Sequence, residues 1–335
     1  MKTIFEKNRK RSGVRMKRQV LSLLLALLLL TGGAAALAYA SPGADEARET
    51  AGVPAATVQT KRSKIDSIRF GPGENALVLL PGGSAPSEGG KTLAEIWRSG
   101  VLRVGTTGDY KPMSFLDPET EEYWGFDTEL AEDLAAALGV EIEYVPTTWP
   151  TLMEDTLVGK FDLAICGITV TDARQEQALM SDGYLGNGKT VLCREEDAER
   201  YVSLEAINRP EVRVMENPGG LNEKFARENL PDAELIIHDV NEEIPGLVAA
   251  GEADVMITEI MEAGYYVGQD ARLAAPLIYE PFTRGQLGVL MPKGSEDLLD
   301  FVNGFLAEEK QSGRLDELAE EYIYRYITEA PDQAA

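Results

Sequence analysis

Two hydrophobic patterns alternate along the chain, and together they predict strands and helices in turn. Residues 102–106 form a short apolar run of the length of a strand. Residues 126–138 instead carry apolar side chains at helical spacing, at Leu130, Leu134, Ala137 and Leu138, and Gly139 provides a stop signal. Similar runs predict strands at residues 140–144, 161–165, 212–215, 234–237 and 255–257, and helices at residues 151–158, 298–310 and 314–324.

This alternation predicts the fold class. Strands separated by helices of about 10–15 residues are typical of α/β proteins, in which mostly parallel sheets are flanked by helices. The pattern occurs once before residue 188 and again from residue 204 onward, which indicates two lobes. Ligands of such folds bind at the carboxyl ends of the strands, so we expect a site in the cleft between the lobes.

The N-terminal segment has the composition of an export signal. Residues 1–19 contain eight Lys or Arg and one acid, residues 20–38 are almost wholly apolar, and Ala38-Tyr39-Ala40 fits a cleavage site. We therefore assign residues 1–40 as a signal peptide and predict a periplasmic or extracellular protein. The apolar run is also long enough to stay in the membrane as an anchor, so tethering is an open alternative. Residues 41–91 are expected to be a flexible linker, within which residues 68–80 could form a short strand pair.

The net charge limits the partners. The whole sequence carries −24, and the part that follows the basic residues 1–40 carries about −31. Such a surface repels nucleic acid and anionic membranes, so neither is an expected partner. Anionic ligands must therefore be captured by a few local cations.

The residue types that usually hold metals or cofactors are scarce. The single histidine, His238, ends a predicted strand, so we expect a structural or surface role and exclude a multi-histidine metal site. Residues 183–190 match the literal phosphate-loop pattern, but residues 190–193 continue as a strand where that motif requires a helix, so we reject nucleotide binding. Cys166 and Cys193 could pair in an oxidising compartment or stay as buried free thiols. We expect no metal and no cofactor.

A glycine-rich turn at residues 217–225 is the strongest candidate for chemistry. It follows a predicted strand and opens a helix, so its backbone N–H groups could bind a carboxylate. Glu223 has two interpretations: it complements the helix dipole, or it is a protonated acid that acts on a ligand. The candidate residues of this turn are Asn217, Gly219, Gly220, Asn222, Glu223 and Lys224.

Loops at other strand ends offer further candidates. Gly167 and Thr169 follow the strand at residues 161–165, and Arg174 lies in a helix that Thr171 could cap. Hydroxyl and guanidinium groups in such a loop suit the bidentate binding of a carboxylate. Residues that could flank a flat ligand are Asp109, Tyr110, Phe115 and Trp149. Ordinary packing of these loops and a solvated Arg174 are the alternatives.

The order of these segments resembles that of extracellular solute-binding proteins for polar amino acids. The shared segments are GTTGDYKP at 105–112, GFD at 125–127, GIT at 167–169 with Arg174, and Ala253-Asp254. Within that superfamily the chain is most similar to the periplasmic cyclohexadienyl dehydratases, which are enzymes of the same fold. The markers are TWP at 148–150, DLAI at 162–165, GKT at 188–190 and above all NPGGLNEKFA at 217–226. The resemblance covers roughly residues 92–325.

The resemblance implies a two-lobed periplasmic-binding-protein type II fold of the α/β class. Residues 92–188 and 286–330 would form lobe 1, and residues 189–285 would form lobe 2. It also implies conversion of prephenate to phenylpyruvate, or of L-arogenate to L-phenylalanine, with loss of water and carbon dioxide.

In that reaction Glu223, with a pKa raised by burial, would protonate the departing hydroxyl. Thr169, Arg174 and the helix N-terminus at Gly220 would hold the carboxylates, with charge added by Lys189 or Lys224.

Two departures from the family pattern bear on the ligand. Glu259 stands where the family usually has an aspartate, which in amino-acid receptors commonly receives the ligand's ammonium group. Residues 282–289 lack a lysine expected of the dehydratases. Two functions are therefore open: a dehydratase, or a non-catalytic receptor that delivers an amino acid to an ABC-transporter permease. We favour the dehydratase because Asn222-Glu223-Lys224 follows the anion-binding turn.

Overall fold

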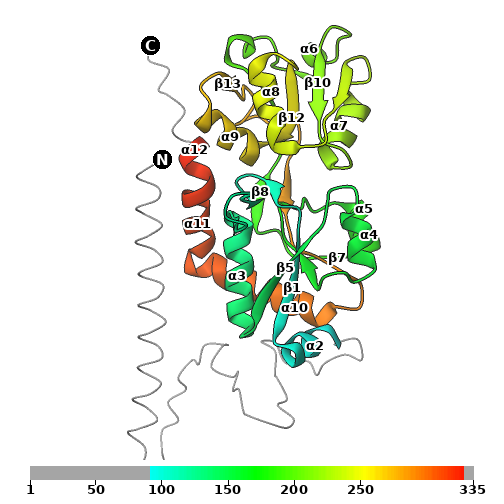
Figure 1. Ribbon diagram of the computed structural model, residues 1–335, viewed down its shortest axis with the longest axis vertical. Helices are drawn as coiled ribbons and strands as arrows, with labels where there is room; N and C mark the ends of the chain where they lie inside the picture. The colour runs from blue at the N-terminus through cyan, green and yellow to red at the C-terminus, as the bar shows by residue number, and fades with distance from the viewer. Residues whose placement is uncertain (1–90, 328–335) are drawn as a thin grey trace, which may run out of the picture. The chain divides into compact units, whose positions relative to one another are not determined.

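The computed structural model describes residues 91–327 (Figure 1). The predicted signal peptide, residues 41–90 with their predicted strand pair, and residues 328–335 lie outside this range. Two five-stranded sheets, each flanked by helices, make up most of the described part, and the α/β class is confirmed.

The first sheet has the strand order β5-β1-β6-β15-β7. Its strands are β5 (Glu141–Pro146), β1 (Val101–Thr106), β6 (Leu163–Ala164), β15 (Leu290–Met291) and β7 (Leu179–Met180). Strand β1 pairs in parallel with β5 and β6, whereas β15 is antiparallel to both of its neighbours. The helices that accompany this sheet are α2 (Lys91–Ser99), α3 (Phe126–Leu138), α4 (Leu152–Leu157), α5 (Asp172–Gln177) and α10 (Glu296–Ser312).

The second sheet has the strand order β11-β10-β12-β9-β13. Its strands are β11 (Glu234–Ile237), β10 (Arg213–Glu216), β12 (Val255–Glu259), β9 (Lys189–Arg194) and β13 (Leu273–Ala274). Strands β11, β10 and β12 run parallel, and β9 is antiparallel to β12. The accompanying helices are α6 (Leu204–Ile207), α7 (Leu221–Asn229), α8 (Ile244–Ala250) and α9 (Ile260–Gln269), with 3₁₀ turns η2 (Glu195–Asp197) and η3 (Asn241–Glu243).

Two paired strands connect the sheets. The chain leaves the first sheet through β8 (Leu185–Asn187) and returns from the second through β14 (Gly285–Leu287), and these two strands pair antiparallel. The parts on either side of this pair form two lobes, each with its own sheet (Figure 1). We keep the boundaries predicted from the sequence, 92–188 with 286–330 and 189–285, as a proposal and call the two parts lobe 1 and lobe 2.

Smaller elements complete the fold. Strands β2 (Asp109–Tyr110), β3 (Ser114–Leu116) and β4 (Tyr123–Trp124) form a three-stranded sheet after β1. The chain ends with α11 (Arg314–Ala319), a π-helical turn at Glu320–Tyr324 and α12 (Arg325–Ile327). Helix α12 lies against α9, where a side chain at Gly264 would meet Ile327.

Local patterns predicted most elements well, with two corrections. Helix α3 has the predicted bounds, and Leu130, Leu134 and Leu138 are buried, but Ala137 is exposed. The strand expected at 161–165 pairs only at Leu163–Ala164, although all five residues are buried. An apolar run therefore predicted burial correctly but overestimated the hydrogen-bonded length.

The structure also decides between the alternatives for the cysteines. Cys166 and Cys193 are both free and buried, so the disulfide interpretation is wrong. Burial raises the pKa of each thiol to about 12. His238 lies at the surface, 2.8 Å from the carboxylate of Glu243. Among residues 91–327, no helix combines the length and hydrophobicity that a membrane span needs.

Candidate functional site

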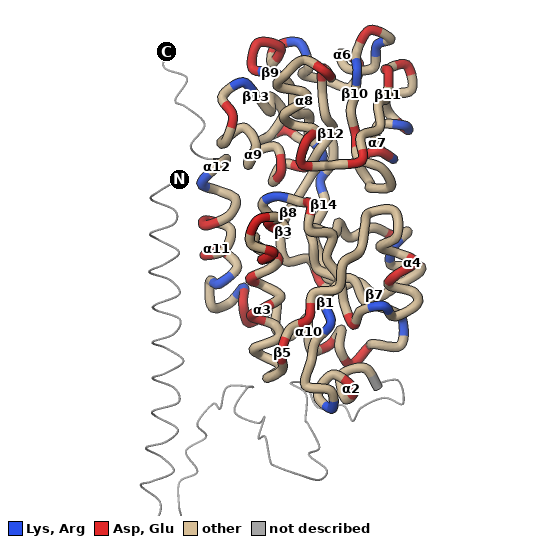
Figure 2. Tube along the Cα trace, viewed as in Figure 1, with Lys and Arg blue, Asp and Glu red and all other residues tan. Residues whose placement is uncertain are grey.

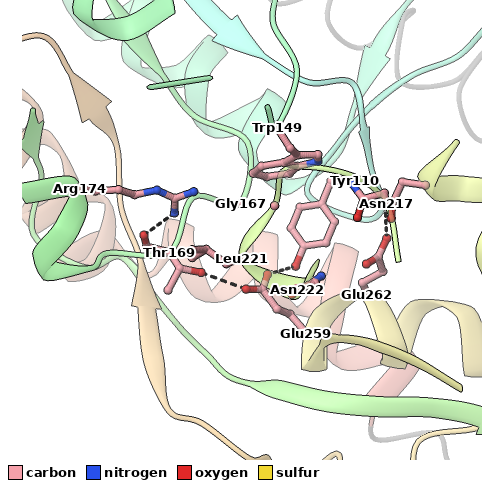
Figure 3. Close-up of a pocket in the computed structure, with 12 residues that line it drawn as sticks. Tyr110, Trp149, Gly167, Thr169, Arg174, Asn217, Leu221, Asn222, Glu259 and Glu262 are labelled. Carbon is pink, nitrogen blue, oxygen red and sulfur yellow. Dashed lines mark hydrogen bonds between the residues drawn. The ribbon is translucent and has the colours of Figure 1, made fainter. Parts of the chain in front are cut away.

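A small cavity lies between the two lobes (Figure 3). Residues from the lobe 1 side of its lining are Tyr110, Trp149, Gly167, Thr169 and Arg174, and residues from the lobe 2 side are Asn217, Gly220, Leu221, Asn222, Asn241, Glu259 and Glu262. Its volume is about 30 Å³, which leaves room for roughly two or three water molecules. The lobes are therefore closed over the site, and a ligand of ten or more heavy atoms enters only when they separate.

One end of the cavity is cationic. The hydroxyl of Thr171 accepts a hydrogen bond from the backbone N–H of Arg174, so the predicted cap of α5 is confirmed. The Arg174 guanidinium donates to the carbonyl of Thr169 at 2.7 Å and lines the cavity. Burial lowers the pKa of Arg174, and the charge of Glu259 opposes this effect. The guanidinium stays protonated, because the ordinary pKa of arginine is far above neutral pH. This end can bind a carboxylate.

Aromatic rings form one wall. The rings of Tyr110 and Trp149 pack edge to face, with centroids 5.9 Å apart, and the Trp149 indole donates to Asp109 at 3.1 Å. Gly167 adopts a φ of 75°, and a Cβ there would lie 2.2 Å from the Tyr110 ring. Glycine is therefore required at this position for the ring to reach the cavity.

The buried carboxyl of Asp127 holds the loop that packs against the Tyr110 ring. Asp127, at the start of α3, accepts hydrogen bonds from the backbone N–H of Gly167 and from the hydroxyl of Tyr184. Burial raises its pKa to about 7, although both hydrogen bonds lower it. Asp127 thus fixes the loop that carries Gly167.

Glu259 links the two lobes. It ends β12 in lobe 2, and its carboxylate accepts hydrogen bonds from the hydroxyl of Tyr110 and, at 3.0 Å, from the hydroxyl of Thr169. The ammonium of Lys189 lies 3.6 Å from the same carboxylate. Glu259 therefore contacts the lobe 1 loops directly.

Glu262 is a second carboxyl in the cavity. It lies in the first turn of α9 and is 1% exposed. The hydroxyl of Thr258 donates to its Oε2 at 2.5 Å, and the side-chain amide of Asn241 donates to its Oε1 at 2.8 Å. Burial raises the pKa of Glu262 to about 8, although these hydrogen bonds lower it. Glu262 therefore holds a proton at neutral pH, and Figure 3 places it across the Tyr110 ring from Arg174.

The glycine-rich turn has the predicted backbone but a different role for its acid. Helix α7 begins at Leu221, after Gly220. The carboxylate of Glu223 accepts hydrogen bonds from the backbone N–H of Gly219 at 2.6 Å and from Arg227 at 2.7 Å. These contacts, the first above all, lower the pKa of Glu223. The expected rise in its pKa is therefore wrong for this arrangement, because the side chain caps its own turn and does not enter the cavity.

The structure brings most of the predicted site residues together. Those that line the cavity are Tyr110, Trp149, Gly167, Thr169, Arg174, Asn217, Gly220, Asn222 and Glu259. Those that do not line it are Asp109, Phe115, Lys189, Gly219, Glu223 and Lys224. Asp109 acts through Trp149, whereas Phe115 is buried against Trp124 and away from the cavity.

The remaining four residues lie around helix α7. Lys189 and Lys224 line a neighbouring cavity of about 290 Å³, together with Arg284. Gly219 lines a hollow on the outer side of the turn, with Glu223.

The sequence reasoning missed Leu221, Asn241 and Glu262. A usable signal existed for Glu262. It is the only carboxylate within α9, a helix whose other residues are mostly apolar or aromatic. Burying a carboxyl among apolar side chains costs free energy of folding. A lone carboxyl in such a helix is therefore a candidate functional residue.

The fold and the interlobe site together define a type II periplasmic-binding-protein architecture. The family model of the bacterial extracellular solute-binding proteins, family 3, matches residues 102–325. The chain belongs to this family.

Comparisons with individual relatives point to two kinds of protein. The chain is 41% identical over 257 residues to the cyclohexadienyl dehydratase of Pseudomonas aeruginosa, covering 75% of this chain and 93% of that protein. It is 27% identical over 257 residues to the L-cystine-binding protein TcyJ of Escherichia coli K12, covering 76% and 95%.

Solved structures show the same division. The ancestral amino acid-binding protein AncCDT-1, a precursor of cyclohexadienyl dehydratase, is similar with a TM-score of 0.65 and 38% identity, covering 69% of this chain and 99% of that one. The substrate-binding protein AbpA of Streptococcus pneumoniae, bound to L-arginine, has a TM-score of 0.63 and 27% identity, covering 68% and 96%.

Proposed function

We propose that the protein is an exported cyclohexadienyl dehydratase that converts prephenate to phenylpyruvate, L-arogenate to L-phenylalanine, or both. The observation that carries the proposal is a protonated, desolvated carboxyl, Glu262, in the same closed cavity as the guanidinium of Arg174. A receptor needs the cation for its ligand but has no use for a buried acid at this place. The 41% identity to a named cyclohexadienyl dehydratase supports the same conclusion.

The chemistry requires one proton and a dry site. The ring C–O bond breaks with its electron pair moving to oxygen, and this oxygen takes the proton of an acid and leaves as water. The bond to the ring carboxylate also breaks, carbon dioxide leaves, and that electron pair completes the aromatic ring. One proton is consumed for each water and carbon dioxide released.

Glu262 fits the role of this acid. Desolvation keeps it protonated before the reaction, and the donors from Thr258 and Asn241 are already aimed at its two oxygens. They stabilise the carboxylate that forms when the proton is transferred, without any rearrangement. We therefore assign the acid to Glu262 and assign Glu223 to capping the turn before α7.

The substrate's carboxylates need cations and N–H donors at the other end. We assign this role to Arg174, to the first N–H groups of α7 at Leu221 and Asn222, and to the hydroxyl of Thr169 once it turns its hydrogen from Glu259 to the bound carboxylate. Lys189, whose ammonium lies 2.5 Å from the side-chain oxygen of Asn222, adds charge behind them. Closure of the lobes excludes water, which strengthens each of these interactions.

The test is a turnover assay with two matched variants. Prephenate and L-arogenate are supplied separately to the purified protein, and the aromatic product is measured for wild type, Glu262→Gln and Glu223→Gln. We expect turnover that Glu262→Gln reduces by about 10²- to 10⁴-fold, the usual contribution of a general acid. Glu223→Gln should retain turnover. Loss of activity in Glu223→Gln but not in Glu262→Gln would show that Glu223 is the general acid. A folded wild type without turnover would contradict the proposed function.

A non-catalytic receptor is the second candidate, and one observation favours it. Arg174 and Glu259 both line the cavity, so one cation and one carboxylate are available for the two charges of an amino acid. A receptor would bind an L-amino acid tightly without turnover and deliver it to an ABC-transporter permease. Calorimetric titration with the common amino acids measures this directly.

Export itself belongs to the proposal. The family is extracellular, and residues 1–40 supply the signal. Fractionation of expressing cells, with N-terminal sequencing of the mature protein, separates a cleaved signal from a retained membrane anchor.

A further inference from the structure

Asn241 holds a central position that the proposed mechanism uses only in part. It lies in η3 of lobe 2, is 4% exposed, and lines the cavity beside Glu262. Its Nδ2 donates to Glu262 Oε1 at 2.8 Å and, across the cleft, to the backbone carbonyl of Asp109 at 3.0 Å. Its Oδ1 is buried and has no hydrogen-bond partner in the part of the chain that the structure describes.

The orientation of this amide is fixed by its neighbours. The backbone carbonyl of Asp109 can only accept hydrogen bonds, so Nδ2 must face it. Turning the amide over would place Oδ1 against this carbonyl oxygen, with no hydrogen between the two acceptors. The unpartnered Oδ1 is therefore a property of the site, and a buried acceptor without a donor has a free-energy cost that a ligand can remove.

We propose that Asn241 Oδ1 accepts a hydrogen bond from a hydroxyl group of the ligand, and that Asn241 and Glu262 together form a hydroxyl subsite at the end of the cavity away from Arg174. Two features select a hydroxyl over an ammonium. Asn241 offers an acceptor, whereas protonated Glu262 offers a donor. A hydroxyl can donate to the first and accept from the second, but an ammonium has no lone pair for the second.

This inference rests on the proposed function and specifies how the leaving group is held. The ring hydroxyl would donate its own hydrogen to Asn241 Oδ1, which turns a lone pair of its oxygen towards the proton of Glu262. When the C–O bond breaks, that oxygen takes the proton and departs as water, still hydrogen-bonded to Asn241. The ligand's carboxylates lie at the Arg174 end, so the ring spans the cavity along Tyr110 and Trp149 (Figure 3).

A pair of unreactive ligands tests the subsite without turnover. 4-Hydroxyphenylpyruvate and phenylpyruvate differ by one hydroxyl at the ring position opposite the side chain. We expect wild type to bind the hydroxylated ligand roughly tenfold more tightly, the effect of one hydrogen bond to a buried group. Asn241→Leu should abolish this preference, because leucine has a similar volume and no acceptor.

Thr258→Val is the matched control. It removes the other hydrogen bond to Glu262 and leaves the Asn241 acceptor in place, so the preference should persist. The affinity for phenylpyruvate in each variant shows that the cleft still folds and closes. Should Asn241→Leu fail to bind phenylpyruvate, Asn241→Ala provides a second variant without the acceptor.

The outcomes separate this inference from the proposed function. A preference that disappears in the Asn241 variants and persists in Thr258→Val supports the subsite, whether or not prephenate is turned over. A preference that persists without the Asn241 side chain, or one that wild type never shows, overturns it. Wild-type turnover combined with either of those results leaves the dehydratase in place and removes only the hydroxyl subsite.

Discussion

The hydroxyl of Tyr110 donates a hydrogen bond to the carboxylate of Glu259, although the two residues belong to different lobes. Thr169 donates to the same carboxylate from lobe 1 at 3.0 Å. A side chain of lobe 2 thus provides contacts that hold the cleft closed. The length of glutamate matters here, because the aspartate expected from the family pattern has one methylene fewer with which to reach across.

We predict that Tyr110→Phe shifts the unliganded protein towards an open arrangement. Hydrogen bonds to charged groups contribute about 1.5–3 kcal/mol, so the ratio of closed to open molecules should fall by about ten- to a hundredfold. Small-angle X-ray scattering would show a larger radius of gyration. The control is Tyr184→Phe, which also removes a hydroxyl bound to a buried carboxyl, that of Asp127, but within lobe 1. An equal expansion in both variants would contradict the prediction.

The pH dependence of catalysis should report Glu262. Because burial raises its pKa to about 8, kcat/KM should be constant through neutral pH and fall about tenfold per pH unit well above 8. Thr258 donates to this carboxyl and so lowers its pKa. Thr258→Val should therefore move the decline to higher pH. A decline that stays in place in this variant would show that another group controls it.

Stability should depend on pH in the direction opposite to that of an ordinary surface carboxylate. Glu262 and Asp127 are protonated in the folded protein up to about pH 8 and 7, whereas their ordinary pKa values are 4.5 and 3.8. Between pH 5 and 7 the unfolded chain has released these protons and the folded one has not, so the free energy of unfolding falls as pH rises. Each group contributes up to about 1.4 kcal/mol per pH unit.

Urea unfolding at pH 5, 6 and 7 measures this slope. Glu262→Gln keeps the shape of the side chain and cannot titrate, so it should remove roughly half of the slope. Asp297→Asn serves as a control at a buried carboxyl outside the cavity. A slope that Glu262→Gln leaves unchanged would refute the assignment of a raised pKa.

Local patterns in the sequence predicted what local physics controls. The bounds of α3 and the cap at Thr171 follow from spacing and cap chemistry, which few distant contacts can change. The strand-end loops predicted nine of the cavity residues, because the carboxyl ends of parallel strands share one edge of a sheet. The charged surface is consistent with the sequence as well: acidic residues are spread over both lobes (Figure 2).

The assignment of the acid could not be predicted in the same way. Glu223 and Glu262 both stand in the first turn of a helix that follows a strand, so their local sequences are alike. They differ in what surrounds them: Arg227 and the N–H of Gly219 lower the pKa of one, and burial raises that of the other. Both partners of Glu223 lie four residues away in the sequence, whereas the burial of Glu262 depends on contacts that only the folded chain creates. The prediction that Phe115 lines the site was wrong for a similar reason. Its ring packs against Trp124, which comes later in the chain, and does not reach the cavity.

The glycine-rich turn of lobe 2 packs closely against Pro150 of lobe 1. Gly219 adopts a φ of 81°, and a Cβ there would lie 2.6 Å from the Pro150 ring, so Gly219→Ala should strain the backbone and push the lobes apart. We expect a lower melting temperature and a KM for prephenate raised by about tenfold, since a shift of about 1.4 kcal/mol in closure is a factor of ten in affinity. Gly304→Ala is the control, because Gly304 lies inside α10 with no atom within 4 Å of an added Cβ. Alanine there should stabilise the protein by up to about 1 kcal/mol and leave KM unchanged. If Gly219→Ala instead binds substrate as wild type does, the close approach of Gly219 to Pro150 is not required for closure.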